Sequence, residues 1–139
     1  MDIVYEDKIS VSDYNSLRAA VGWSTISEAQ AQTGINNSAY LVAAYVSGKA
    51  IGIARLITDG GYIGFIADVI VLPEYQRKNI GSTMISMIIE YIHTNLNVGD
   101  SLYVGLMAVK GKEGFYKRFG FEERPNDNVG AGMTLWISK

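Results

Sequence analysis

The stretch Val69-Ile-Val-Leu-Pro-Glu-Tyr-Gln-Arg-Lys-Asn-Ile-Gly-Ser82 decides the fold, because it joins an apolar strand to a helix through a short loop. The residues before Pro73 are largely β-branched and favour a strand, and a proline cannot donate to a central ladder, so the strand should end there. From Ile80 onward, apolar residues recur at helical spacing. This spacing predicts a helix that begins near Asn79 to Gly81.

The start of this helix is expected to bind an anion. Its first amide groups have no partner within the helix, and the helix dipole places partial positive charge there. Gly81 lets a ligand approach the backbone, and Asn79 tolerates a left-handed conformation. Gln76, Arg77 and Lys78 can add side-chain donors. Phosphate oxygens suit this set of groups.

The loop residues resemble a motif of the GNAT superfamily of acetyl-CoA-dependent N-acyltransferases. The family signature is Gln or Arg, two variable residues, Gly, one variable residue, then Gly or Ala, and this chain has Gln76-Arg-Lys-Asn-Ile-Gly81. The first family glycine is replaced by Asn79, a residue that accepts a positive φ angle. A second stretch, Gly114-Phe-Tyr-Lys-Arg-Phe-Gly-Phe121, resembles the family's late signature, a short helix that carries a tyrosine and leads into a Gly-Phe strand.

The resemblance implies an enzyme that moves an acetyl group from acetyl-CoA, as cosubstrate, to a primary amine by direct attack in a ternary complex. In the family, the loop holds the cofactor pyrophosphate, and the main chain of the preceding strand pairs with the cofactor's amide-containing arm. The residues implied to bind the cofactor are Val69, Ile70, Val71, Gln76, Arg77, Lys78, Asn79, Ile80, Gly81 and Ser82. The alternative reading is a non-catalytic acyl-CoA-binding sensor module, which would keep the loop and need no acid.

The resemblance makes Tyr116 the general acid, which would protonate the departing thiolate. A phenol has a reference pKa of about 10, so it is neutral at pH 7 and can donate a proton. Spacing alone favours a core aromatic between Phe115 and Phe119, and the resemblance reverses that preference. Many family members also carry a cofactor-contacting asparagine before this helix, where the present chain has Val109-Lys110-Gly111.

The general base has three candidates. Asp68 lies within an apolar run, where an unpaired carboxylate would be costly to bury, and such a carboxylate suits proton abstraction. Arg55 lies on the preceding strand, and an Arg55–Asp68 ion pair would instead give Asp68 a structural role. Glu113, three residues before Tyr116, is the second candidate, and a water relay is the third.

The acceptor pocket is expected to come from the front of the chain. Trp23 lies at a corner between a helix and a loop, and Tyr14 can share its side. An aromatic surface there would favour an apolar or cationic amine. Packing of Trp23 against the core is the competing interpretation, and the sequence does not identify the acceptor.

The pattern of elements predicts a single α/β domain over residues 1–139, with a central mixed, mostly antiparallel sheet flanked by helices. The expected helices are a first one capped by Ser12 or Asp13 and ending at Gly22, then 27–33, the long helix after Asn79, and 112–118. The expected strands are 3–5, 40–46, 50–58, 62–72, 101–109, 121–124 and 133–137. A crossover through the long helix should make strand 101–109 parallel to the strand that ends at Leu72.

Composition narrows the range of partners. A formal net charge of -2 and a pI near 5.3 argue against nucleic acid. The chain has no cysteine and a single histidine, His93, so we expect no disulfide and no metal. The amino terminus resembles no signal peptide and no apolar run reaches membrane-spanning length, so a cytoplasmic protein without a membrane partner is expected. The resemblance also allows a homodimer that pairs terminal strands.

Overall fold

The computed structural model describes residues 1–139. The chain divides into two compact units, residues 1–105 and 106–139, and each is described by itself. The elements in chain order are β1 (Ile3–Glu6), α1 (Val11–Ala20), α2 (Glu28–Asn36), β2 (Tyr40–Val46), β3 (Lys49–Thr58), β4 (Ile63–Val71), the 3-10 turn η1 (Pro73–Tyr75), α3 (Ile80–Asn95), β5 (Tyr103–Leu106) and α4 (Glu113–Lys117).

A five-stranded sheet in the order β1-β2-β3-β4-β5 forms the centre of the first unit. The β1–β2, β2–β3 and β3–β4 pairs are antiparallel. The Tyr103 N–H donates to the Tyr62 carbonyl, so the starts of β5 and β4 lie side by side and these two strands run parallel. The α3 crossover requires this direction. The sheet is therefore mixed and mostly antiparallel, which confirms the predicted fold class.

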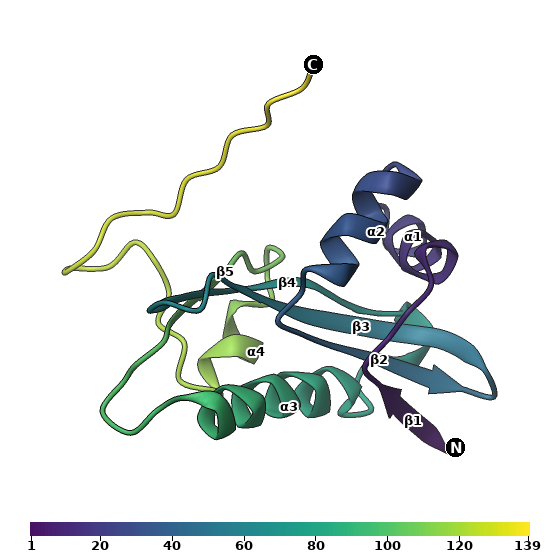
Figure 1. Ribbon diagram of the computed structural model, residues 1–139, viewed down its shortest axis with the longest axis horizontal. Helices are drawn as coiled ribbons and strands as arrows, with labels where there is room; N and C mark the ends of the chain where they lie inside the picture. The colour runs from purple at the N-terminus through teal and green to yellow at the C-terminus, as the bar shows by residue number, and fades with distance from the viewer. The chain divides into compact units, whose positions relative to one another are not determined.

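Helices cover both faces of the sheet (Figure 1). The inward face of α3 is aliphatic, and its residues Ile80, Met84, Ile85 and Ile88 are almost completely buried. Helix α1 lies on the opposite face and buries Leu17. This arrangement follows from the helical spacing of apolar residues, which places them on one stripe of each helix. None of the helices combines the length and the hydropathy needed to cross a bilayer.

Two local details of the first unit differ from the sequence prediction. The N-cap of α1 is Ser10, whose Oγ accepts the Asp13 N–H at 3.0 Å, and not Ser12 or Asp13. All three residue types can cap a helix. Ser10 directly precedes the first helical residue, Val11, whereas Ser12 and Asp13 already lie inside the first turn. Helix α2 begins after its cap Ser27 as expected but continues to Asn36.

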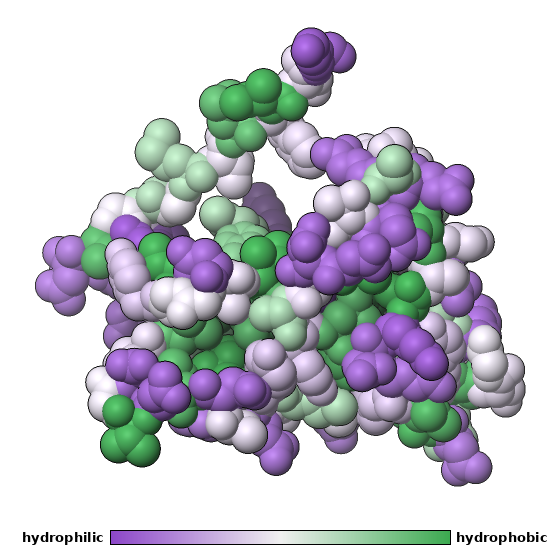
Figure 2. Space-filling model, in the orientation of Figure 1, coloured by the Kyte–Doolittle hydropathy of each residue, from purple (hydrophilic) through white to green (hydrophobic).

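The second unit contains α4 and no strand beyond residue 106. The strands expected at 121–124 and 133–137 are not formed, so this prediction is wrong. A turn is present, because Asn126 Oδ1 accepts the Asn128 and Val129 N–H groups at 2.9 and 3.2 Å, but no ladder extends from it. Apolar residues of 133–137 remain exposed, and Figure 2 shows apolar side chains on this C-terminal segment. Residues of strand-like composition need a neighbouring strand before they form one.

Candidate active site

The loop between β4 and α3 has an unusual backbone. After η1, Arg77 and Asn79 both adopt left-handed conformations, with φ angles of 61° and 63°. Asn79 is the N-cap of α3, so the left-handed conformation anticipated for it is confirmed. The left-handed Arg77 was not anticipated. Together these turns bring the chain from the end of the strand directly to the first amides of the helix.

The side chains of the loop divide between structural and solvent-facing roles. Gln76 Nε2 donates to the Val71 carbonyl at 2.9 Å, so this amide ties the loop to the strand. Arg77 and Lys78 are exposed. The Lys78 ammonium lies 5.9 Å from the centroid of the Tyr75 ring. Two exposed cations therefore directly precede the helix start, which suits an anionic ligand.

The strand end that precedes this loop is paired on one edge. Ile70 lies opposite Ile53 and Val71 opposite Gly52, both on β3. The contact between β4 and β5 that is formed by Tyr103 and Tyr62 lies at the other end of β4. Ile70 and Ile80 are buried, so these two residues can offer a ligand their main chain and not their side chains.

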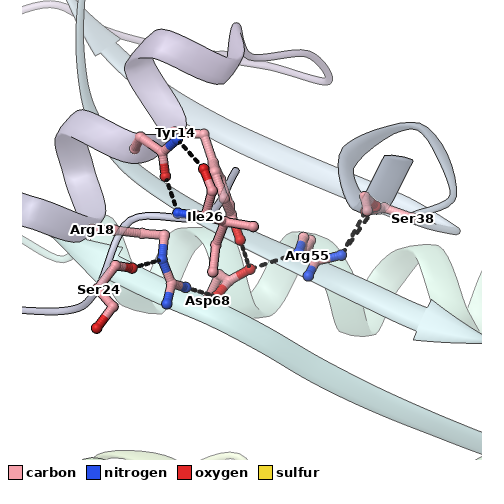
Figure 3. Close-up of polar contacts among 9 residues, drawn as sticks. Tyr14, Arg18, Ser24, Ile26, Ser38, Arg55 and Asp68 are labelled. Carbon is pink, nitrogen blue, oxygen red and sulfur yellow. Dashed lines mark hydrogen bonds and ion pairs between the residues drawn. The ribbon is translucent and has the colours of Figure 1, made fainter. Parts of the chain in front are cut away.

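Asp68 lies at an irregularity of β4 and at the centre of a polar cluster (Figure 3). Its φ angle is 54°, and the β3–β4 register shifts between Ile53 and Arg55. Asp68 Oδ2 accepts from Arg55 Nε at 2.7 Å and from the Tyr14 hydroxyl at 2.7 Å, and Oδ1 accepts from Arg18 Nη1 at 2.9 Å. We call Tyr14, Arg18, Arg55 and Asp68 the Asp68 cluster.

The cluster is largely withdrawn from water. The side chains of Arg18, Arg55 and Asp68 are 11%, 14% and 10% exposed. The Arg55–Asp68 ion pair considered as the structural alternative is thus present, and Arg18 forms a second one. These contacts favour the structural alternative for Asp68, since three donors already occupy its carboxylate.

Arg18 joins the two aromatic residues predicted for the acceptor pocket. Its guanidinium carbon lies 5.8 Å from the Tyr14 ring centroid and 5.4 Å from that of Trp23. Tyr14 is buried and Trp23 is half-buried. Burial, together with the hydrogen bond to Asp68, raises the pKa of Tyr14 above its usual value, so its hydroxyl remains a donor at neutral pH.

The loop that carries Trp23 is held to α1 by side chains. Arg18 Nε donates to the Ser24 carbonyl at 2.7 Å. Asn15 forms a reciprocal pair with Ile26, because its Nδ2 donates to the Ile26 carbonyl and its Oδ1 accepts the Ile26 N–H, both at 2.8 Å. This loop is therefore fixed beside the Asp68 cluster.

In the second unit, Tyr116 is buried on α4 and packs edge-on against Phe115 and Phe121. Burial raises the pKa of Tyr116 above its usual value. Its near neighbour Glu113 is exposed, and its carboxylate accepts the Gly111 N–H at 3.0 Å. Hydrogen bonds from its own main-chain N–H and from that of Gly111 lower the pKa of Glu113, which makes it a weaker base.

Sequence reasoning missed the role of Arg18. A signal for this role is present in the sequence, because Arg18 lies four residues after Tyr14 and next to Leu17, on the buried face of the helix. A cation on such a face needs a buried anion as partner. As for metals, no group of three or more histidine, cysteine or carboxylate side chains is placed to hold an ion.

Comparison with known proteins assigns the family. The profile of the acetyltransferase (GNAT) domain matches residues 10–136. The uncharacterized N-acetyltransferase ycf52 of Pyropia yezoensis is 25% identical over 85% of this chain and 68% of its own length. The chloroplastic GCN5-related N-acetyltransferase 2 of Arabidopsis thaliana is 30% identical over 66% of this chain, but only 33% of its own length is covered.

A solved structure supports the same assignment over nearly the whole chain. SA2161 of meticillin-resistant Staphylococcus aureus, described as a protein of unknown function and probable acetyltransferase, is 31% identical. The match covers 98% of this chain and 100% of SA2161, with a TM-score of 0.86. The chain belongs to the GNAT acetyltransferase family.

Proposed function

We propose that this protein transfers an acetyl group from acetyl-CoA to a primary amine by direct attack in a ternary complex. The GNAT family uses acetyl-CoA, and the match over residues 10–136 spans both compact units. We therefore also propose that the two units act as a single acetyltransferase domain. The observation that carries the proposal is the left-handed Asn79 at the start of α3. This conformation leaves the first helical amides open to an anion, and the exposed cations Arg77 and Lys78 directly precede them.

In this proposal the cofactor is held at two places. The pyrophosphate lies at the amides of the α3 start, including those of Gly81 and Ser82, with Arg77 and Lys78 beside it. The amide-containing arm of the cofactor pairs with the main chain of residues 69–71, which are paired with β3 on their opposite edge at Ile70 and Val71. A main-chain amide there polarises the thioester carbonyl and stabilises the charge that develops on its oxygen.

The chemical step needs a neutral amine and two proton transfers. The amine nitrogen attacks the thioester carbon, the carbon–sulfur bond breaks, and the sulfur leaves with the bonding electrons. Tyr116 gives its proton to that sulfur, and the raised pKa of Tyr116 keeps the phenol protonated until it is needed. The carboxylates of Asp68 and Glu113 already accept hydrogen bonds from other donors. We therefore propose that water, rather than either carboxylate, carries away the amine proton.

The experiment that tests this proposal separates binding from chemistry. Acetyl-CoA binding is measured by calorimetry, and acetyl transfer by release of free CoA over a panel of amines. Tyr116→Phe should lower turnover by about 10²-fold or more and leave acetyl-CoA affinity nearly unchanged. Tyr62→Phe, which alters a tyrosine that is 67% exposed, is the matched control and should keep full activity.

Two results would count against the proposal. Normal turnover in Tyr116→Phe would remove this residue from the role of acid. Tight acetyl-CoA binding without transfer to any amine would favour the non-catalytic sensor module. Arg77→Gln and Lys78→Gln should each weaken acetyl-CoA binding. The loss of affinity should be larger at low salt, because high salt screens the exposed charges that these substitutions remove.

A further inference from the structure

The Asp68 cluster holds more positive charge than negative charge. Two guanidinium groups, those of Arg18 and Arg55, face one carboxylate. Asp68 is the one carboxylate that forms an ion pair with either arginine, so no second carboxylate balances the surplus. The second arginine leaves a net charge of one positive unit in a region largely withdrawn from water.

Both arginines also have donors to spare. Arg18 uses Nε for the Ser24 carbonyl and Nη1 for Asp68. Arg55 uses Nε for Asp68, and Nη1 for the Gly34 carbonyl and Ser38 Oγ. The Nη2 atom of each arginine donates to no protein atom. No completely buried side-chain nitrogen lacks a hydrogen-bond partner, so each Nη2 atom keeps some contact with solvent.

The position of the cluster relates it to the proposed reaction. Asp68 directly precedes the strand residues 69–71, which we propose to hold the acetyl-bearing arm of the cofactor. One or two residues along a strand correspond to about 3–7 Å. Figure 3 shows Arg18 and Arg55 approaching Asp68 from two sides. Trp23 lies beside Arg18 on the fixed loop that follows α1.

We propose that the acceptor is an amine that also carries an anionic group, a carboxylate or a phosphate, which binds to Arg18 and Arg55. This inference rests on the proposed function and names the substrate class of the same site. Planar guanidinium groups with paired N–H donors recognise both kinds of anion. A polycationic amine would meet the surplus positive charge and be repelled. The charge of the cluster thus replaces the expectation, drawn from the aromatic residues Trp23 and Tyr14, of an apolar or cationic acceptor.

The test uses pairs of acceptors that differ only in the anionic group. An α-amino acid is compared with its amide, and phosphoethanolamine with ethanolamine, so the two pairs separate carboxylate from phosphate recognition. The anionic member should have a kcat/KM higher by about tenfold or more in at least one pair. Arg55→Gln should bring this ratio close to one, mainly through KM. Lys49→Gln, which removes a cation that is 62% exposed, should preserve the ratio.

A second readout needs no turnover. The chain has two tryptophans, so Trp136→Phe leaves Trp23 as the only fluorescent indole. Acetate or inorganic phosphate should change Trp23 fluorescence saturably in this variant, and adding Arg55→Gln should abolish the change. Arg55→Lys retains the charge, and circular dichroism of both Arg55 variants checks that loss of binding does not reflect loss of folding.

The combined outcomes separate this inference from the proposed function. Turnover without preference for the anionic acceptors, together with an unchanged Trp23 signal, would overturn the inference and leave the acetyltransferase intact. Saturable anion binding without turnover of any amine would support the anion site and count against the proposed reaction. An absence of both anion binding and turnover would overturn both.

Discussion

Replacing Asp68 with asparagine should destabilise the protein more than any exposed charge change. The substitution keeps the size of the side chain, and asparagine adopts positive φ as readily as aspartate, so the backbone at 54° is not strained further. The negative charge is lost, and one of the two acceptor oxygens becomes an NH2 group that can only donate. Arg18 and Arg55 then face each other without an anion, in side chains that are 11% and 14% exposed.

The structure sets the size of the effect. Removing one partner of a buried ion pair costs about 3–5 kcal/mol, because the other charge stays buried and unpaired. Unfolding entropy is about 2 cal/mol/K per residue, or about 0.3 kcal/mol/K for 139 residues. The expected fall in Tm is therefore about 10–17 °C. The free energy of unfolding is measured in urea by far-ultraviolet circular dichroism, and the Tm by thermal unfolding.

A matched control is Glu74→Gln, which breaks a 3.8 Å pair with Lys49 whose side chains are 58% and 62% exposed. We expect this control to lose less than about 0.5 kcal/mol. A loss below about 1 kcal/mol in Asp68→Asn would refute the reasoning, because the arginines would then be well solvated. Phosphate should stabilise Asp68→Asn more than the parent protein, since binding to the folded state adds to its stability.

Further predictions address other parts of the chain. Because burial raises the pKa of Tyr116, its contribution to stability should be complete below about pH 10 and lost as pH rises through the raised value. Absorbance at alkaline pH should show several late-titrating tyrosines, and Tyr116→Phe should remove one of them. Asn79→Val should cost about 1–2 kcal/mol in urea unfolding, whereas Asn79→Gly should cost nothing, and equal losses would contradict the left-handed cap. Gly52→Ala should lose about 1–3 kcal/mol, since its Cβ would lie 3.0 Å from the Ile70 carbonyl oxygen and 3.2 Å from Met84 Cε. Gly114→Ala, with open space around it, should not destabilise.

The fold of the first unit could be predicted because its signals are local. The strand Tyr40–Val46 and the left-handed Asn79 follow from residue type and spacing, and both are as expected. The strand prediction at 133–137 failed for a non-local reason. Residues of this composition form a strand only beside another strand, and no partner strand is formed for them in the second unit.

The candidate site divides in the same way. The Arg55–Asp68 pair could be anticipated because the two residues lie on consecutive strands joined by a short turn. Local spacing places Arg18 on the buried face of α1, but its pairing with Asp68 depends on how α1 docks on the sheet, which no local pattern gives. The hydrogen bond from Gln76 to the Val71 carbonyl could not be predicted either, since it depends on the path of the loop back to the strand end.

Asp68 connects the proposed acceptor site with the proposed cofactor site, because it pairs with Arg18 and Arg55 and directly precedes residues 69–71 in β4. Its left-handed conformation would be costly in an ordinary strand, and three donors from α1 and β3 hold it in place. The same donors leave the positive charge that we propose for acceptor recognition. A change at Arg55 therefore alters both the anion site and the constraint on the strand that precedes Val69. Acceptor specificity and acetyl-CoA placement should consequently change together in Arg55 variants, whereas Arg77 variants should affect the cofactor alone.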